Sequence, residues 1–154
     1  MQRMSRSRKA IDRRRALYLM RRQIEERGHQ IAYLRLARSL IGDRSNKCRW
    51  QALIVVGEFI KIAPDAVWNI ARKYGVSKDE DMRNGVATVL LEHLLEYHFS
   101  EIFPKVKSLV LKDEHFADTF QRIWRFGQAK HARNSRRLDA LEAQLIRREK
   151  LVDP

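Results

Sequence analysis

The sequence contains few of the residue patterns that identify most small enzymes and secreted domains. Its 154 residues include one cysteine, three prolines and six glycines. A single cysteine excludes an internal disulfide and is typical of a reducing compartment, so we expect a cytoplasmic protein. No glycine-rich phosphate loop, paired cysteine set or Ser/His/Asp arrangement is recognisable. We therefore expect no catalytic residue, no cofactor and no metal site, and a function other than catalysis, with the enzyme class left open.

Long apolar runs are also missing. The longest candidate is 52–62, and Glu58 interrupts it. A membrane-spanning helix needs about 18 or more apolar residues, so we expect no membrane span. The N-terminal MQRMSRSRKAIDRRR lacks the apolar core of a secretory signal, which is about 7 to 15 residues long. Its arginines and serines leave a transit peptide as an alternative.

Positive charge is abundant and unevenly distributed. The formal net charge is +13. Residues 1–49 hold 15 Lys and Arg against 4 Asp and Glu, residues 50–128 hold 10 against 11, and residues 129–154 hold 7 against 4. A cluster of arginines repels itself, and charge segregated in this way indicates a polyanionic partner.

Apolar periodicity predicts helices throughout the chain, because apolar residues recur at helical spacing on one face of each segment. Gly28, Gly42 and Gly75 are suitable helix ends, and Pro64 suits the first turn of a helix. Residues 1–7 are expected to be frayed. The predicted helices cover residues 8–27, 29–41, 46–62, 64–74, 77 or 79 to 97, 99 or 100 to 111, 113–128 and 131–150.

Two segments of the chain are similar to each other, with Arg83 following Arg49 by 34 residues. The first reads CRWQA followed by VVG and Phe59, and the second reads MRNGV followed by VL and Leu94. This pattern resembles the HEAT repeat, although Leu91 stands where the pattern has glycine and a third start at Asp113 lacks the arginine. The resemblance covers residues 43–128 and implies a short α–α superhelix of stacked helical hairpins.

The HEAT resemblance also implies roles for individual residues. The arginines at positions 49 and 83 are expected to pair with a neighbouring carboxylate, for which Asp43, Asp79 and Asp81 are candidates. Some HEAT-like proteins are DNA glycosylases for alkylated bases, which makes that activity an alternative that fold analogy alone does not carry. The predicted organisation is a single domain, 1–154, with a basic N-terminal hairpin (1–42), the repeats (43–128) and a basic C-terminal helix (129–154).

Several other residues were weighed for chemistry. The densest ionisable cluster surrounds His93 and Glu96, which lie one turn apart, but no second copy completes a metal site. Cys48 occupies an apolar repeat position and is expected to be buried. Trp68 and Trp124 are expected to fill seams between repeats, whereas Trp50 is the least suited of the three tryptophans to burial.

The function that the sequence favours is non-enzymatic binding of nucleic acid, DNA or RNA, mainly through backbone phosphates. The alternative for the basic N-terminal helix is a solvated polar face, and the alternative function is a protein–protein adaptor. A partner or self-association would then use Leu138, Leu141, Leu145 and Ile146 of the last helix. The residues expected to contact nucleic acid are Arg13, Arg14, Arg15, Arg21, Arg22, Arg72, Lys73, Lys105, Lys107, Arg133, Arg136 and Arg137.

Overall fold

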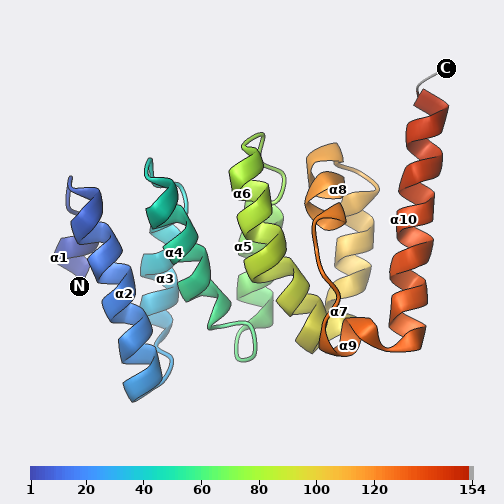
Figure 1. Cartoon of the computed structure of the whole chain (residues 1–154). Helices are drawn as coiled ribbons and strands as arrows, with labels where there is room; N and C mark the ends of the chain where they lie inside the picture. The colour runs from blue at the N-terminus through green and yellow to red at the C-terminus, as the bar shows by residue number, and fades with distance from the viewer. Residues whose placement is uncertain (153–154) are drawn as a thin grey trace. The chain divides into compact units, whose positions relative to one another are not determined.

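The computed structural model describes the backbone of residues 1–152 and the side chains of residues 1–148 and 150. Every regular element in this part of the chain is helical, and none is a strand (Figure 1). The prediction of an all-α protein is confirmed. Among the described helices, none combines the length and apolarity needed to cross a membrane. The chain divides into two compact units, Met1–Ile70 and Ala71–Pro154, called here the first and second units.

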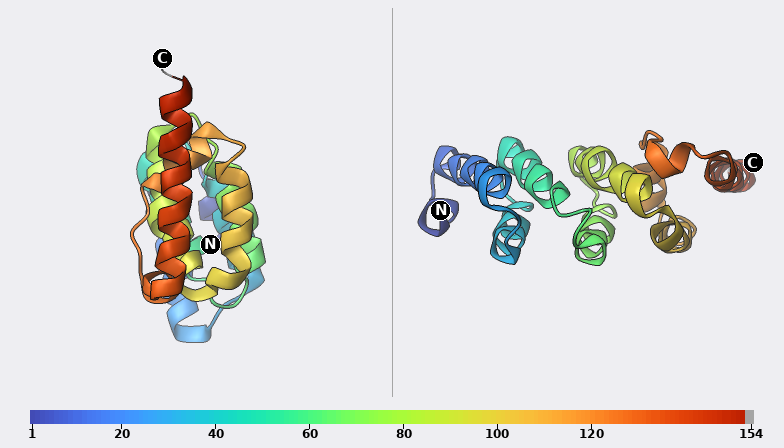
Figure 2. Two further views of the ribbon diagram at one scale, coloured as in Figure 1. Left: turned by 90° about the vertical axis from the view of Figure 1, so that its right-hand side faces the viewer. Right: turned by 90° about the horizontal axis from the view of Figure 1, so that it is seen from below.

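The first unit contains two parallel helices, α2 and α4, connected through the helix α3. α2 and α4 run in the same direction, since the Cys48 thiol donates to the Ala10 carbonyl (3.4 Å) near their starts and Arg21 meets Glu58 (3.0 Å) near their ends. α3 lies on one side of this pair (Figure 2). Cys48 is fully buried, as expected. The elements are α1 (Gln2–Ser5), α2 (Ala10–Arg27), α3 (Ile31–Leu40), α4 (Asn46–Gly57) and the beginning of α5 (Pro64–Tyr74).

Two expectations for the first unit were wrong. Residues 1–7 are not frayed: α1 forms there, and Ser5 is 3% exposed with its hydroxyl donating to the Gln2 carbonyl (2.8 Å). The helix expected over 46–62 ends at Gly57. Beyond it the backbone tightens, because the N–H groups of Phe59 and Ile60 bond to carbonyls three residues earlier.

The second unit begins with one long helical run. It comprises α6 (Glu80–Gly85), the π-helical segment η1 (Val86–Leu91) and α7 (Glu92–Val110). A kink at His98 (φ −134°, ψ 39°) confirms the break expected between residues 97 and 99. The Gln128 side chain satisfies the backbone there, accepting from Phe99 N–H (2.9 Å) and donating to the Tyr97 carbonyl (2.8 Å).

The helix expected over 113–128 is shorter than predicted. α8 (Glu114–Gln121) is followed by the non-helical residues 123–126 and then by α9 (Gly127–Lys130). Trp124 is 72% exposed, so the expectation that it fills a seam was wrong. Trp68 is buried at 7%, as expected. The sequence pattern failed here because a carboxylate on α7 and two on α10 hold the segment out of helical geometry.

The last helix, α10 (Ala132–Val152), lies parallel to the second half of α7. The Arg137 guanidinium lies over the Phe103 ring (4.5 Å), and further along Arg148 donates to the Leu111 carbonyl (2.8 Å). This packing removes most of the expected partner stripe from solvent. Leu138, Leu141 and Leu145 are at most 5% exposed, and only Ile146 of that set is open, at 49%.

A hydrogen-bond pattern recurs at three helix starts, Ser7–Arg13, Asp43–Arg49 and Ser77–Arg83, which we call junction motifs. In each, the arginine Nη1 donates to the carbonyl six residues earlier, at 2.8, 3.2 and 2.8 Å. In each, the first side chain also accepts from the N–H two residues later, at 3.2, 2.8 and 3.1 Å. A fourth start at Asp113 has Thr119 in the arginine position. The sequence comparison found the second and third copies but missed the first.

Candidate nucleic-acid interface

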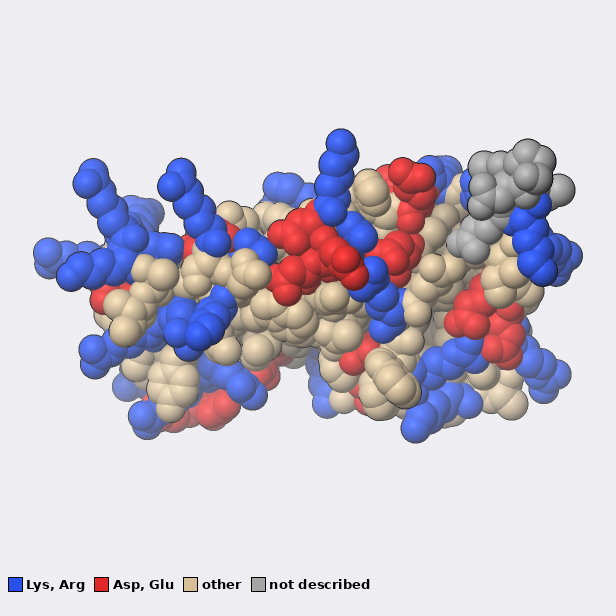
Figure 3. All heavy atoms as spheres, turned by 45° about the horizontal axis from the view of Figure 1, so that its top comes forward, with Lys and Arg blue, Asp and Glu red and all other residues tan. Residues whose placement is uncertain are grey.

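The two units differ strongly in charge. The first holds 16 Lys and Arg against 6 Asp and Glu, a net of +10, and the second holds 16 against 13, a net of +3. Figure 3 shows cationic side chains over α1–α4 and acidic side chains over the starts of α6 and α8. The first unit therefore carries the excess charge of the chain.

The helix starts of the first unit are cationic and lack side-chain caps. Neither α2 nor α4 has a side chain that accepts its first N–H groups. Arg8 and Lys9 precede α2, and Arg44 and Lys47 flank the start of α4; all four are exposed. A helix start carries partial positive charge from its unpaired N–H groups, and cations placed beside it add to that charge. Because α2 and α4 are parallel, both starts lie at the same end of the first unit, where an anion would be stabilised.

The helix starts of the second unit already contain carboxylates. Asp79 caps α6, accepting from Asp81 N–H (3.0 Å) and Met82 N–H (3.4 Å). Asp113 caps α8, accepting from Phe116 N–H (2.8 Å). The carboxylates near the starts of α2 and α4 cap neither helix: Asp12 accepts from the Ser7 hydroxyl (2.7 Å), and Asp43 is paired with Arg13.

Arg13 belongs to the fold rather than to an interface. Its guanidinium donates twice to Asp43 (2.5 and 2.9 Å), and the two side chains are 15% and 5% exposed. The hydrogen bond from Arg13 holds the pKa of Asp43 below its ordinary value. Arg83 is used in the same way, with Asp118 as its partner (2.6 Å) rather than Asp43, Asp79 or Asp81. We therefore withdraw Arg13 from the expected contacts.

The other expected residues of α2 are accessible. Arg14 and Arg15 are exposed, and among the described residues neither has a carboxylate partner. Arg21 contacts Glu25 (3.7 Å) and Glu58 (3.0 Å), while Arg22 contacts Glu26 (2.9 Å). The Arg21 and Arg22 side chains are 48% and 57% exposed. Exposed pairs of this kind contribute about 0–1 kcal/mol, so both guanidiniums can exchange partners.

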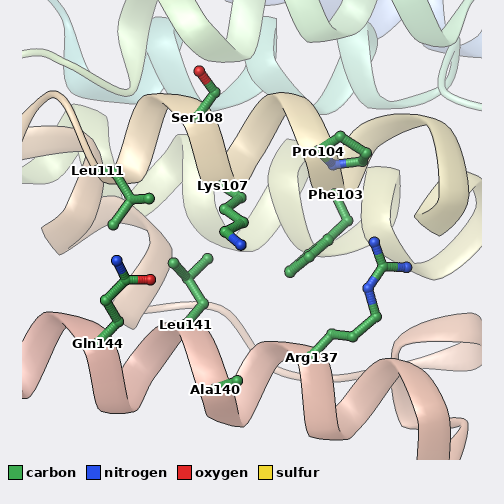
Figure 4. A pocket seen from close by; sticks show the side chains of 9 residues that line it. All are labelled: Phe103, Pro104, Lys107, Ser108, Leu111, Arg137, Ala140, Leu141 and Gln144. Atoms are coloured by element: carbon green, nitrogen blue, oxygen red, sulfur yellow. The ribbon is translucent and has the colours of Figure 1, made fainter.

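The expected residues of the second unit are all exposed and lie on three helices. Lys107 and Arg137 are brought together from α7 and α10, where both line one groove (Figure 4). The groove has an apolar floor that includes Phe103, Leu111 and Leu141, and no carboxylate lines it. The structure gives no comparable convergence for the other members of the set, which are Arg72, Lys73, Lys105, Arg133 and Arg136.

Sequence reasoning missed the residues that the geometry favours most. Arg8, Lys9, Arg44 and Lys47 were counted only as bulk charge, although cations at a helix start oppose the usual preference for acids there. The unusual placement of cations at these helix starts was the signal in the sequence that could have identified them. Trp124 was missed because its exposure depends on contacts far along the chain.

The acidic cluster that the sequence singled out is structural. The buried Glu92 carboxylate accepts the Trp124 N–H (3.0 Å), and the His93 Nδ1 meets Glu96 (2.7 Å). Desolvation raises the pKa of Glu92, although the Trp124 hydrogen bond acts in the opposite direction. Within the described residues, no group of three His, Cys, Asp or Glu is arranged to hold a metal ion.

Comparison with known proteins gives no match to any family model, curated protein or solved structure.

Proposed function

We propose that this protein binds nucleic acid through its backbone phosphates and that the start of α2 and the start of α4 form the main contact. The observation that carries the proposal is the pairing of uncapped helix starts with exposed cations at one end of the first unit. Phosphate oxygens accept hydrogen bonds from backbone N–H groups and from guanidinium or ammonium groups. We expect such binding to depend little on the nucleotide sequence, because the phosphates are the same at every base.

We further propose that the fold is a short HEAT-like stack of helical hairpins. The three junction motifs support this, because they place the same bonds at intervals of 36 and 34 residues. Within the first unit, α2 and α4 start at the same end, as the first helices of stacked hairpins would. The exposed Arg14 and Arg15 of α2 would extend the phosphate contact along the helix from its start.

Salt dependence is the decisive experiment. Full-length protein would be titrated with a labelled duplex between 50 and 200 mM salt. Contact with about six phosphates gives a slope of log K against log salt of about −5. A flat slope, or no binding at 50 mM salt, would refute the proposal. The same titration with single-stranded DNA and structured RNA distinguishes the nucleic-acid classes.

A second candidate function, a protein–protein adaptor, has one specific observation in its favour. The α7–α10 groove combines an apolar floor with Lys107 and Arg137 and suits a segment that carries apolar and acidic side chains. Ala140, an exposed residue in the groove wall, provides the test. Ala140→Trp would fill the groove and abolish partner binding, and it would leave duplex binding unchanged if the two functions use separate surfaces.

A further inference from the structure

The segment between α8 and α9 presents aromatic rings to solvent. Trp124 is 72% exposed and Phe126 is 36% exposed. An indole exposed to this extent leaves a large apolar surface in water. Burying that surface would stabilise the fold, because aromatic side chains contribute large apolar areas. The backbone that carries the two rings is non-helical over residues 123–126.

One backbone hydrogen bond and several from the Arg125 side chain hold this segment in place. The buried Glu92 carboxylate accepts the Trp124 N–H at 3.0 Å. The next residue, Arg125, donates to Ser135 Oγ (2.8 Å), Asp139 (2.6 Å) and Glu142 (2.9 Å) on α10. The segment is therefore anchored to α7 on one side and to α10 on the other, and the ring of Trp124 is displayed on a fixed support.

Keeping Glu92 there costs stability. Its carboxylate is 6% exposed, and desolvation disfavours its charged form. A neutral acceptor would satisfy the Trp124 N–H at a lower cost. The arrangement thus retains an unfavourable buried acid and an unfavourable exposed indole in one place, which is a pattern expected of a binding site rather than of a packing solution.

The Phe126 ring has both cationic and acidic neighbours, since His93 beside it is bonded to Glu96 (2.7 Å). The Phe126 ring stacks on His93 (centroids 6.0 Å apart, 21° between planes), and the Lys130 ammonium lies 5.7 Å from its centroid. Arg133 is exposed in the first turn of α10, and in the described part of the chain neither it nor Lys130 contacts a carboxylate. An exposed π face beside unneutralised cations matches a nucleotide, in which a flat base is joined to a phosphate.

We propose that Trp124 is a stacking platform for an unpaired nucleobase and that Lys130 and Arg133 contact the adjoining phosphates. The ligand class is single-stranded nucleic acid, because the base faces inside a duplex are already covered by their neighbours. This inference rests on the proposed function and adds to it a preference for single strands that the first unit does not provide.

The test compares full-length variants on two probes, a labelled 15-nucleotide oligo(dT) and a labelled 15-base-pair duplex, by fluorescence anisotropy at one salt concentration. Trp124→Ala is expected to weaken oligo(dT) binding about tenfold, since base–aromatic stacking accounts for about 1–3 kcal/mol per base. Duplex binding should be unchanged. Trp124→Phe should recover most of the loss, and Ile146→Ala, at another exposed apolar residue, should have no effect.

Tryptophan fluorescence gives a readout that does not depend on a destabilising variant. Oligo(dT) should quench the emission of a Trp50→Phe variant, and adding the conservative Trp124→Phe should remove that quenching, since the remaining Trp68 is buried. Equal losses on both probes, or quenching that survives Trp124→Phe, would overturn the platform and leave phosphate binding intact. Failure of the unmodified protein to bind either probe would refute the proposed function as well.

Discussion

The junction motifs at Ser7–Arg13 and Ser77–Arg83 form the same bonds in surroundings of opposite charge. In both, the arginine donates to carbonyls six and five residues earlier and to one carboxylate of a later element. The residues between the serine and the arginine differ: RKAID in the first motif and KDEDM in the second. The first helix start therefore has two cations, one acid and no side-chain cap, and the second is capped by Asp79.

This difference shows that the bonds that stabilise the fold and the side chains that could contact a partner are different parts of the motif. The buried guanidinium and its acceptors are equivalent in both units and are satisfied within the chain. The exposed positions of the motif contribute only backbone groups to those bonds, so the charge of their side chains can change without disturbing the bonds. Two helix starts with the same junction motif can therefore differ in whether they bind an anionic partner.

The largest expected effect comes from reversing charge at equivalent exposed positions. Arg8, Arg44 and Lys78 each occupy the second position of a junction motif. Arg8→Glu with Arg44→Glu should weaken duplex binding by at least tenfold at 100 mM salt and reduce the salt slope by about 2. Lys78→Glu should change neither quantity detectably. Anisotropy titrations measure both quantities. Equal losses of duplex affinity for the three substitutions would contradict the proposed difference between the helix starts.

Removing the buried guanidiniums tests the structural half of the comparison. Arg13→Ala should destabilise the protein by about 3 kcal/mol, because it removes both guanidinium hydrogen bonds from the 5%-exposed Asp43 carboxylate and leaves Arg49 as its nearby cation. Arg83→Ala should cost less, since Asp118 is 36% exposed and keeps Arg122 at 2.9 Å. Arg14→Ala, the exposed neighbour, should stay within about 0.5 kcal/mol. Urea unfolding of the three variants measures the order.

The pH dependence of stability should have opposite signs at Asp43 and Glu92. The pKa of Asp43 is lowered by Arg13, so its contribution is present above the ordinary pKa of 3.8 and is lost as pH falls. Desolvation raises the pKa of Glu92, so its folded state binds a proton more tightly and stability falls as pH rises above about 4.5.

Two neutral substitutions isolate these contributions. Asp43→Asn should lower the unfolding free energy at pH 7, with the deficit shrinking toward pH 3. Glu92→Gln should raise it at pH 7 and leave it little changed near pH 4, while keeping an acceptor for the Trp124 N–H. Unfolding curves across this range measure both, and a pH-independent gain at Glu92 would contradict desolvation as the cause.

The smallest expected effect concerns the fourth helix start, where a threonine replaces the arginine. The buried Thr119 hydroxyl lies 2.6 Å from the Gly75 carbonyl and 3.0 Å from the His115 carbonyl. Thr119→Val keeps the shape and removes the bond to Gly75, which should cost about 1 kcal/mol. A cost close to that of Arg13→Ala would mean that the fourth start is as strongly bonded as the first.

The sequence predicted what depends on local patterns. Apolar spacing indicated the break at His98 and the burial of Trp68, and the similarity of two segments indicated the equivalence of Arg49 and Arg83. The equivalent role of Arg13 was hidden, because it lies in a run of three arginines that composition alone describes as exposed charge. Only its distance to Asp43, thirty residues away, distinguishes it from Arg14.

By itself, then, the sequence determined the helical class and the concentration of positive charge toward the N-terminus, because both follow from residue types and their periodicity. Tertiary structure decided which cations are neutralised within the chain, which helix starts a carboxylate caps, and that Trp124 faces solvent while Leu138 does not. These outcomes depend on carboxylates and helices that are distant in sequence, and a local pattern contains no information about them.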